Sequence, residues 1–339
     1  MPTLAIALAG AAALSAVGAP AAALLGATIA VTLAAALRFD ARVPDNLRDV
    51  GFTTIGVTLG VGITPDFFAD LARFPISLAV LAVTMLAIIG AGQLLLRHRF
   101  GVERGTATLA MSPGALSYTL ALATADKAGH HDVGSITVVQ SLRLLLITLL
   151  LPPVVAFTNG DAPLTGEAGA SGGAAVLGLP ISAVLIVLAW CVGVGCRAAR
   201  VPAPFLVSGV LVSGLGHGLG WLEGRPAESL TFVGFSIAGA VIGSRFASIS
   251  AGMLRRHLVA GFVASALALS ISALASIAVA RHLQLPFGQV WIAFAPGGVE
   301  AMSAMALALD YDPVYVATHH IFRLVLLMAL LPVLLHRRA

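Results

Sequence analysis

Long apolar runs separated by short polar connections make up almost the whole chain. They fall into twelve windows, six in each half: residues 3–18, 20–37, 47–64, 74–96, 105–126, 133–156, 176–196, 202–220, 231–249, 258–280, 288–309 and 314–335. Most approach the length of about 20 apolar residues that a helix needs to cross a bilayer. The pattern predicts an all-α membrane protein that passes through the lipid bilayer many times.

The second half of the chain repeats the spacing of the first. At a shift of 183 residues, Gly51, Phe52, Gly56, Gly60, Gly105, Pro113 and Gly114 fall on Gly234, Phe235, Gly239, Gly243, Gly288, Pro296 and Gly297. An arginine then follows within an apolar run in both halves, at Arg143 and Arg323. These matches predict an internal duplication, with a membrane repeat over 1–156, a link over 157–175 and a second membrane repeat over 176–339.

The fifth window of each half is interrupted by a Pro-Gly pair, at Pro113-Gly114 and at Pro296-Gly297. At 1.5 Å per residue, each part of such a window reaches only about half way through a bilayer. We therefore expect two re-entrant helical hairpins with their tips near the midplane. A single kinked helix that crosses is the alternative, because membrane helices tolerate Pro and Gly.

The placement of the basic residues distinguishes these arrangements. If the fifth windows re-enter and the N-terminus is cytoplasmic, thirteen of the 19 Lys and Arg residues, Arg48 and Arg197 among them, fall in cytoplasmic loops or the C-terminal tail. The acidic link then lies outside and the basic C-terminus lies inside, so the repeats are inverted, with about ten crossings in all. Six crossings per repeat would put the link and the C-terminus on the same side. We therefore predict a multi-pass protein of the inner (plasma) membrane with both termini in the cytoplasm.

The composition of the chain excludes a soluble domain and argues against a nucleic-acid-binding protein. The chain is 59% hydrophobic and 10% charged, with a mean hydropathy of +1.00, which excludes an ordinary soluble domain. A pI near 9.7 is typical of proteins that bind nucleic acid, but here most bases end helices on the inner side, and no soluble module is available to enter a groove. Direct binding of nucleic acid is not expected.

The most distinctive segments are SPGALSYTLALA with VVQSLRLLLITLLLP, and APGGVEAMSAMALALDYDPVYVATHHIFRLVLLMALLP. Together they resemble the AbrB-type duplicated integral membrane proteins over essentially the whole chain. Those proteins typically have PGG followed by an acidic residue and Met, an aspartate-containing turn, and a Gln-x-x-Arg-like step into an apolar helix. They are commonly labelled regulators of gene expression and sometimes ammonia monooxygenases, and they share a name, but no fold, with a soluble DNA-binding regulator. The architecture also looks like that of inverted-repeat transporters with broken helices.

The first half departs from this pattern. It has Ala115 and Ser117 where the second half has Gly298 and Glu300, and it has Gln140 where the second half has His320. Any binding site is therefore expected to be asymmetric.

Two roles are open for the arginines in the apolar runs, where a charge costs about 2.5–3.5 kcal/mol on insertion scales. Arg143 and Arg323 could bind an anion such as a carboxylate, or each could hold its own hairpin through backbone carbonyls. Likewise, the Pro-Gly tips could bind an anion at the following helix N-termini or could be packing kinks. Glu300 could carry a proton or a cation, or could pair with Arg323 or Arg143.

The predicted substrate- or ion-binding residues are Ser112, Pro113, Gly114, Ser117, Gln140, Arg143, Pro296, Gly297, Gly298, Glu300, His320 and Arg323. Because the adjacent histidines His319 and His320 on a helix point about 100° apart, a redox metal centre, and with it a monooxygenase activity, is not expected. No cofactor and no enzymatic activity are predicted. The leading hypothesis is a secondary transporter of a small anion. The alternative is a membrane sensor that influences gene expression without contacting DNA. The GxxxG pairs Gly56/Gly60 and Gly239/Gly243 are expected to pack within the fold rather than between subunits, although a homodimer is left open.

Overall fold

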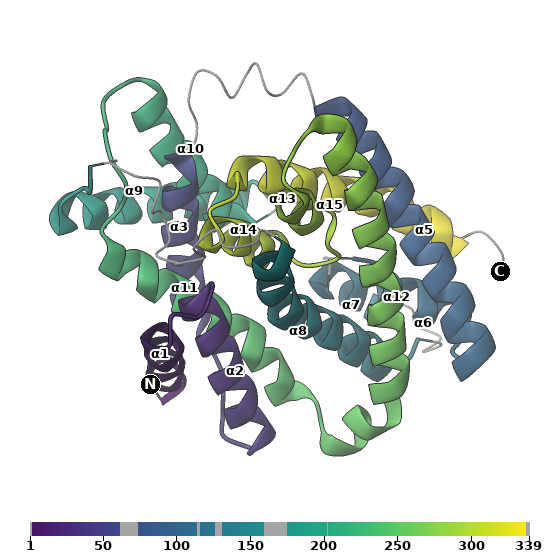
Figure 1. The fold of residues 1–339 in the computed structure, drawn as a ribbon. Coiled ribbons are helices and arrows are strands. Elements are labelled where there is room, and N and C mark those ends of the chain that lie inside the picture. The colour runs from purple at the N-terminus through teal and green to yellow at the C-terminus, as the bar shows by residue number, and fades with distance from the viewer. Residues whose placement is uncertain are drawn as a thin grey trace. The chain divides into compact units, whose positions relative to one another are not determined.

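The computed structural model describes residues 2–61, 74–113, 116–125, 131–158, 175–201 and 203–336, which are almost entirely helical (Figure 1). These residues form fourteen α-helices: α1 (Pro2–Ala16), α2 (Ala22–Ala36), α3 (Asp45–Gly60), α5 (Phe74–Phe100), α6 (Arg104–Met111), α7 (Leu116–Ala125), α8 (Val133–Thr158), α9 (Leu179–Ala198), α10 (Pro204–Gly218), α11 (Glu228–Ser244), α12 (Ala251–Leu283), α13 (Phe287–Phe294), α14 (Val299–Ala308) and α15 (Pro313–His336). A 3-10 turn, η2 (Arg245–Ser248), follows α11.

The helices coincide with the apolar windows of the sequence, so the predicted all-helical fold is confirmed. Each fifth window consists of two short helices, α6 with α7 and α13 with α14, separated at the Pro-Gly pair. Among the described helices, six are long and apolar enough to cross a membrane: α5, α8, α9, α11, α12 and α15. Helices α1, α2 and α10 have 15 residues each, about 22 Å of helix, which is less than the hydrocarbon core of a typical bilayer. A total of ten crossings therefore stays a prediction.

The chain divides into two compact units, and both halves of the sequence contribute to each. Unit 1 comprises Met1–Ala72, Leu151–Ala247 and Val299–Ala317, and unit 2 comprises Arg73–Leu150, Ser248–Gly298 and Thr318–Ala339. This division groups residues by packing and does not test the repeat boundaries at 156 and 176. Most of the link, residues 159–174, lies outside the described residues.

Close helix contacts at glycines hold unit 1 together. Helix α3 packs against α10 and α11, and α2 packs against α1 and α11. A Cβ atom added at Gly56 would collide with the backbone of Leu206 on α10, and one added at Gly239 would collide with the backbone of Leu24 on α2. Gly60 and Gly243 have equally close neighbours on the same two helices. Both GxxxG pairs therefore pack inside the fold, where the missing side chains let backbones approach.

Contacts in unit 1 recur at a constant shift along the chain. Gly51 on α3 lies against Ile237 on α11, and Gly234 on α11 lies against Thr54 on α3. A shift of 183 residues carries the first contact onto the second, because it relates Gly51 to Gly234 and Thr54 to Ile237. Helices α3 and α11, which correspond to the third apolar window of each half, thus contact each other through positions that the shift relates.

Unit 2 encloses the first broken segment in apolar side chains. Leu109, Ala110 and Met111 at the end of α6 are completely buried, in one cluster with residues of α5, α8 and α12. A second cluster joins Met85 of α5 to Leu327 of α15. The freed backbone groups of a helix break are therefore surrounded by protein, which is the condition for such a break at membrane depth.

The two ends of the first broken segment lie together. The Asp132 N–H, just before α8, donates to the Thr106 hydroxyl in the first turn of α6 at 3.0 Å. His131 Nδ1 also lies 3.4 Å from a carboxylate oxygen of Glu103, the residue that precedes α6. The residues that directly precede α6 and α8 therefore lie close together.

Candidate functional site at the broken helices

Buried polar side chains gather at the helix breaks in unit 2. Ser112 ends α6 with extended backbone, and its hydroxyl donates to the Thr108 carbonyl at 2.8 Å. Pro113 is also buried. Gly114 lies outside the described residues, and for Ser117 the structure describes only the helical backbone of α7.

Arg143 of α8 holds the end of α6 through backbone carbonyls. The side chain is 1% exposed, and its Nη atoms donate to the carbonyl oxygens of Ala110, Met111 and Ser112 at 3.3, 3.2 and 2.9 Å. Its Nε donates to the Pro296 carbonyl at 3.1 Å. One guanidinium therefore joins the two Pro-Gly breaks, and its planar array of donors suits it to this role.

Gln140 lies one turn before Arg143 on α8 and is buried. Its amide nitrogen donates to the Leu109 carbonyl at 2.8 Å and to the Thr119 hydroxyl of α7 at 2.9 Å. Gln140 therefore links α8 to both short helices of the first break.

Arg323 and His320 of α15 make the corresponding contacts at the second break. Arg323 donates from Nη1 to the Ala295 carbonyl at 2.6 Å and from Nη2 to the Gly297 carbonyl. His320 Nε2 lies 2.9 Å from the Ile292 carbonyl. Shifted by 183 residues, the acceptors Leu109 and Ser112 of the first break fall on Ile292 and Ala295 of the second. The structural role foreseen for the arginines, holding the breaks through carbonyls, is therefore present at both sites.

The turn at the second break is compact and mostly buried. The Gly297 N–H donates to the Ala295 carbonyl at 2.8 Å, while the Pro296 carbonyl accepts from Arg143. Pro296 and Gly297 are buried, and Gly298 is half-buried. These three residues lie in unit 2 with the arginines that bind them.

The two breaks differ in how completely the side chains are satisfied. Arg143 uses Nε and both Nη atoms, whereas Nε of Arg323 is buried without a hydrogen-bond partner among the described residues. Nδ1 of His320 is likewise buried and without a partner there. The two breaks, which differ in sequence at Gln140 and His320, thus also differ in the hydrogen bonding of individual side-chain atoms.

His319 occupies a buried polar position that the sequence analysis did not connect to a partner. Its Nε2 lies 2.7 Å from the Ser77 hydroxyl of α5, and its ring lies between those of Phe74 and Phe294, with centroids 5.7 and 6.1 Å away. A serine near the start of an apolar helix gives no signal that it contacts a histidine far along the chain.

Glu300 has its electrostatic partner in unit 1. It is half-buried in the first turn of α14 and lies near enough to Arg245, which follows α11, for their opposite charges to interact. Both residues belong to unit 1. The sequence analysis considered Arg143 and Arg323 as partners and did not consider Arg245.

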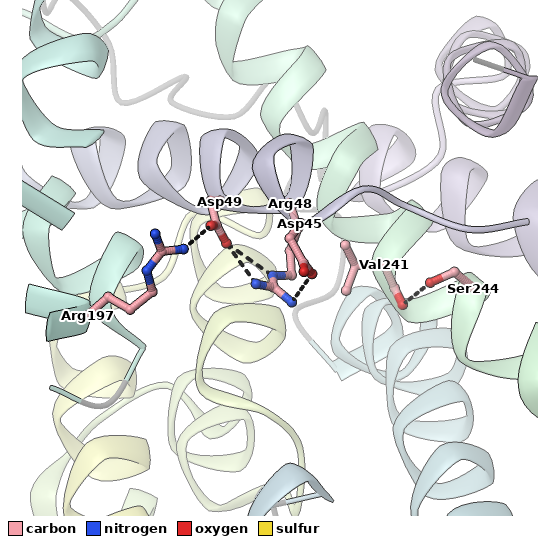
Figure 2. A network of polar contacts seen from close by, with 6 residues as sticks. All are labelled: Asp45, Arg48, Asp49, Arg197, Val241 and Ser244. Carbon is pink, nitrogen blue, oxygen red and sulfur yellow. Dashed lines mark hydrogen bonds and ion pairs between the residues drawn. The ribbon is translucent and has the colours of Figure 1, made fainter. Parts of the chain in front are cut away.

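A buried carboxylate joins two helix ends of unit 1 and was not foreseen (Figure 2). Asp49 of α3 is 2% exposed and accepts from Arg48 at 2.9 Å and from Arg197, near the end of α9, at 3.3 Å. The Arg197 guanidinium also lies 5.3 Å from the centre of the Phe205 ring. The start of α3 and the end of α9 are thus fixed side by side.

These features define a class: a helical multi-pass membrane protein whose broken helices are held by buried arginines. The particular family follows from comparison with known sequences. The family model described as "Transition state regulatory protein AbrB" matches residues 23–338, so the chain belongs to the AbrB family, as its motifs suggested. A curated relative, "Uncharacterized protein YhjN" of Bacillus subtilis (strain 168), is 25% identical over 300 residues, which cover 84% of this chain and 76% of that protein.

Proposed function

We propose that this AbrB-family protein is a secondary transporter of a small anion, such as a carboxylate, which binds at the broken helices of unit 2. The observation that carries the proposal is the orphan Nε–H of Arg323, buried at a helix break beside a second buried guanidinium. Arg323 and Arg143 bind the carbonyls of three consecutive residues, Ala295, Pro296 and Gly297, so their positive charges lie close together, and among the described residues no ion pair compensates Arg323. An anion would neutralise this charge in a low-dielectric site.

The proposal includes a re-entrant hairpin in the first half. A crossing helix would separate residues 104 and 132 by the thickness of the membrane, about 30 Å. The hydrogen bond between Asp132 and Thr106 and the contact between His131 and Glu103 instead support a segment that enters and returns. By analogy of sequence, we propose the same for α13 and α14.

The proposal also includes two inverted repeats. With six crossings in each repeat, Arg48 and Arg197 would lie on opposite sides of the membrane. In the inverted arrangement both are cytoplasmic, and their shared contact with Asp49 supports that arrangement (Figure 2). The reciprocal contacts of Gly51 and Gly234 support two copies related by pseudo-symmetry. Inverted repeats with broken helices are typical of secondary transporters.

Glu300 is the proposed coupling residue. The proposed role is to bind the coupling ion, because this half-buried carboxylate lies near enough to Arg245 for the two charges to interact. Neutralising it should affect the dependence of transport on an ion gradient more than the binding of the anion.

Uptake into proteoliposomes tests the proposed function. Purified protein is reconstituted, and the entry of labelled carboxylates and inorganic anions is followed under proton and sodium gradients, with R323A and E300Q in parallel. We expect uptake of at least one anion, its loss in R323A and a changed ion dependence in E300Q. If no anion moves under any gradient, the transporter proposal is rejected.

The family description favours a second candidate, a membrane sensor that regulates a partner. A sensor would bind its ligand without moving it. Ligand-dependent stabilisation of the purified protein together with the absence of uptake would therefore favour the sensor.

A further inference from the structure

Two unsatisfied polar atoms lie one helical turn apart on α15. The Arg323 side chain is 2% exposed and that of His320 is 0% exposed, yet Arg323 Nε and His320 Nδ1 have no hydrogen-bond partner among the described residues. Residues three apart on a helix are neighbours on one face. A buried polar atom without a partner is unfavourable, so such a pair indicates a place for a bound group.

The two atoms offer opposite halves of a hydrogen bond. Arg323 Nε always carries a hydrogen and can only donate. His320 Nε2 faces the Ile292 carbonyl, which can only accept, so Nε2 carries the hydrogen of the ring. In the neutral imidazole this leaves Nδ1 as an acceptor. The pair therefore provides one donor and one acceptor.

Holding the helix break does not require this arrangement. In the first half, Arg143 and Gln140 bind the equivalent carbonyls of Ser112 and Leu109, and Arg143 Nε is satisfied by Pro296. A glutamine at position 320 could bind the Ile292 carbonyl in the same way. The chain instead has a histidine there, and its second ring nitrogen, Nδ1, is an additional acceptor. Holding the helix break uses only Nε2 of His320, so Nδ1 has no part in that role.

We infer that Arg323 Nε and His320 Nδ1 bind a small oxyanion that carries a proton, such as hydrogencarbonate, hydrogenphosphate or a monoprotonated dicarboxylate. An oxygen of the ligand accepts from Arg323, and its O–H donates to His320. Among the described residues, the other charged or titratable groups nearby are Arg143, which binds the Pro296 carbonyl between the two carbonyls that Arg323 binds and favours an anion, and His319, which is engaged with Ser77. A fully deprotonated anion would set an oxygen lone pair against the Nδ1 lone pair and leave Nδ1 unsatisfied.

The inference rests on the proposed transport function and specifies its substrate class. It also sets the stoichiometry, because the anion crosses together with the proton that it carries. No protein group needs to titrate for that proton to move.

Pairs of anions with one shape and one charge, differing in the proton, test the inference. Hydrogenphosphate pairs with sulfate, and hydrogencarbonate pairs with nitrate. Uptake of each is measured in proteoliposomes for the wild type, for H320Q and for H282Q, a control at an exposed histidine of α12. Glutamine supplies an amide nitrogen that can donate to Ile292 in place of His320 Nε2, as Gln140 does for Leu109, but it has no atom that takes the place of Nδ1.

We expect the wild type and H282Q to prefer the hydrogen-bearing member of at least one pair by roughly tenfold, the effect of leaving one buried acceptor unpaired. H320Q should lose that preference while keeping its melting temperature within a few degrees. If anions move but sulfate and nitrate each do so as well as their hydrogen-bearing partners, or if H320Q keeps the preference, the inference is wrong and Nδ1 binds only water, while the transport proposal stands. If no anion moves, the transport proposal fails and the inference fails with it.

Discussion

Arg143 donates its Nε–H to the carbonyl oxygen of Pro296 at 3.1 Å, so an arginine from the first half of the chain binds the helix break of the second half. The same guanidinium holds the end of α6 in its own half. Arg323, by contrast, binds among the described residues only carbonyls of the break in its own half. Arg143 therefore contributes more to the stability of the fold than Arg323, and substitutions of the two should change that stability by different amounts.

Replacing Arg143 by lysine should destabilise the protein more than replacing Arg323. Lysine cannot present the planar array of donors that reaches carbonyls on both breaks, and hydrogen bonds from a charged group contribute about 1.5–3 kcal/mol each. We expect R143K to lower the melting temperature clearly in a thermal unfolding assay, and R323K to lower it less while abolishing uptake. Equal destabilisation by the two variants would contradict the division of roles.

Adding a methyl group at a buried glycine of unit 1 should be costly. At Gly56 and Gly239 the new Cβ would meet backbone atoms of the facing helix, which cannot move aside as a side chain can. We expect G56A and G239A to destabilise by roughly 1–3 kcal/mol, the usual cost of overpacking. G90A is the matched control, because Gly90 on α5 has open space at its Cβ. It should be neutral or slightly stabilising, since alanine favours helix over glycine. Thermal melting of the three variants in detergent checks this.

Glu103 should make the stability of unit 2 depend on pH. Burial raises the pKa of Glu103, but hydrogen bonds from the N–H groups of Gly105 and Thr106 and the nearby His131 outweigh burial and lower the pKa below its ordinary value. A lowered carboxyl pKa stabilises the folded state above the unfolded value of 4.5, and that stabilisation is lost as pH falls through the folded pKa. Melting curves from neutral to acidic pH should show the wild type approaching E103Q. A constant difference between them would show that the carboxylate has no such role.

The inverted arrangement predicts that the link and the C-terminus lie on opposite sides of the membrane. A periplasmic reporter fused within residues 157–175 should be active, and the same reporter fused after residue 339 should be inactive, with a cytoplasmic reporter giving the reverse. Activity of one reporter at both positions would exclude inverted repeats.

Much of this structure could be predicted from sequence because its signals are local. Apolar runs of helical length gave the helices, and the Pro-Gly pairs gave the breaks, since proline and glycine act on the backbone where they stand. Arg143 and Arg323 could be connected to the breaks because a charge in an apolar run must find partners within the protein, and a helix break offers free backbone carbonyls.

Long-range pairing could not be predicted in the same way. The contacts of Asp49 with Arg197 and of Ser77 with His319 join residues far apart in the chain. Arg48 and Arg197 were interpreted only as inner-loop charges, although both bind one buried carboxylate. The different satisfaction of Arg143 and Arg323 depends on the position of single atoms, which residue types alone do not specify.

Counterflow tests the central claim most directly, because exchange of an anion across the membrane needs no knowledge of the coupling ion. Proteoliposomes are loaded with a high concentration of unlabelled anion and diluted into a trace of the same anion in labelled form. We predict transient accumulation of label for at least one small oxyanion with the wild type, and none with R323A or empty liposomes. Failure of every tested anion to accumulate with folded wild-type protein, or equal accumulation with R323A, would contradict an anion transporter built around Arg323.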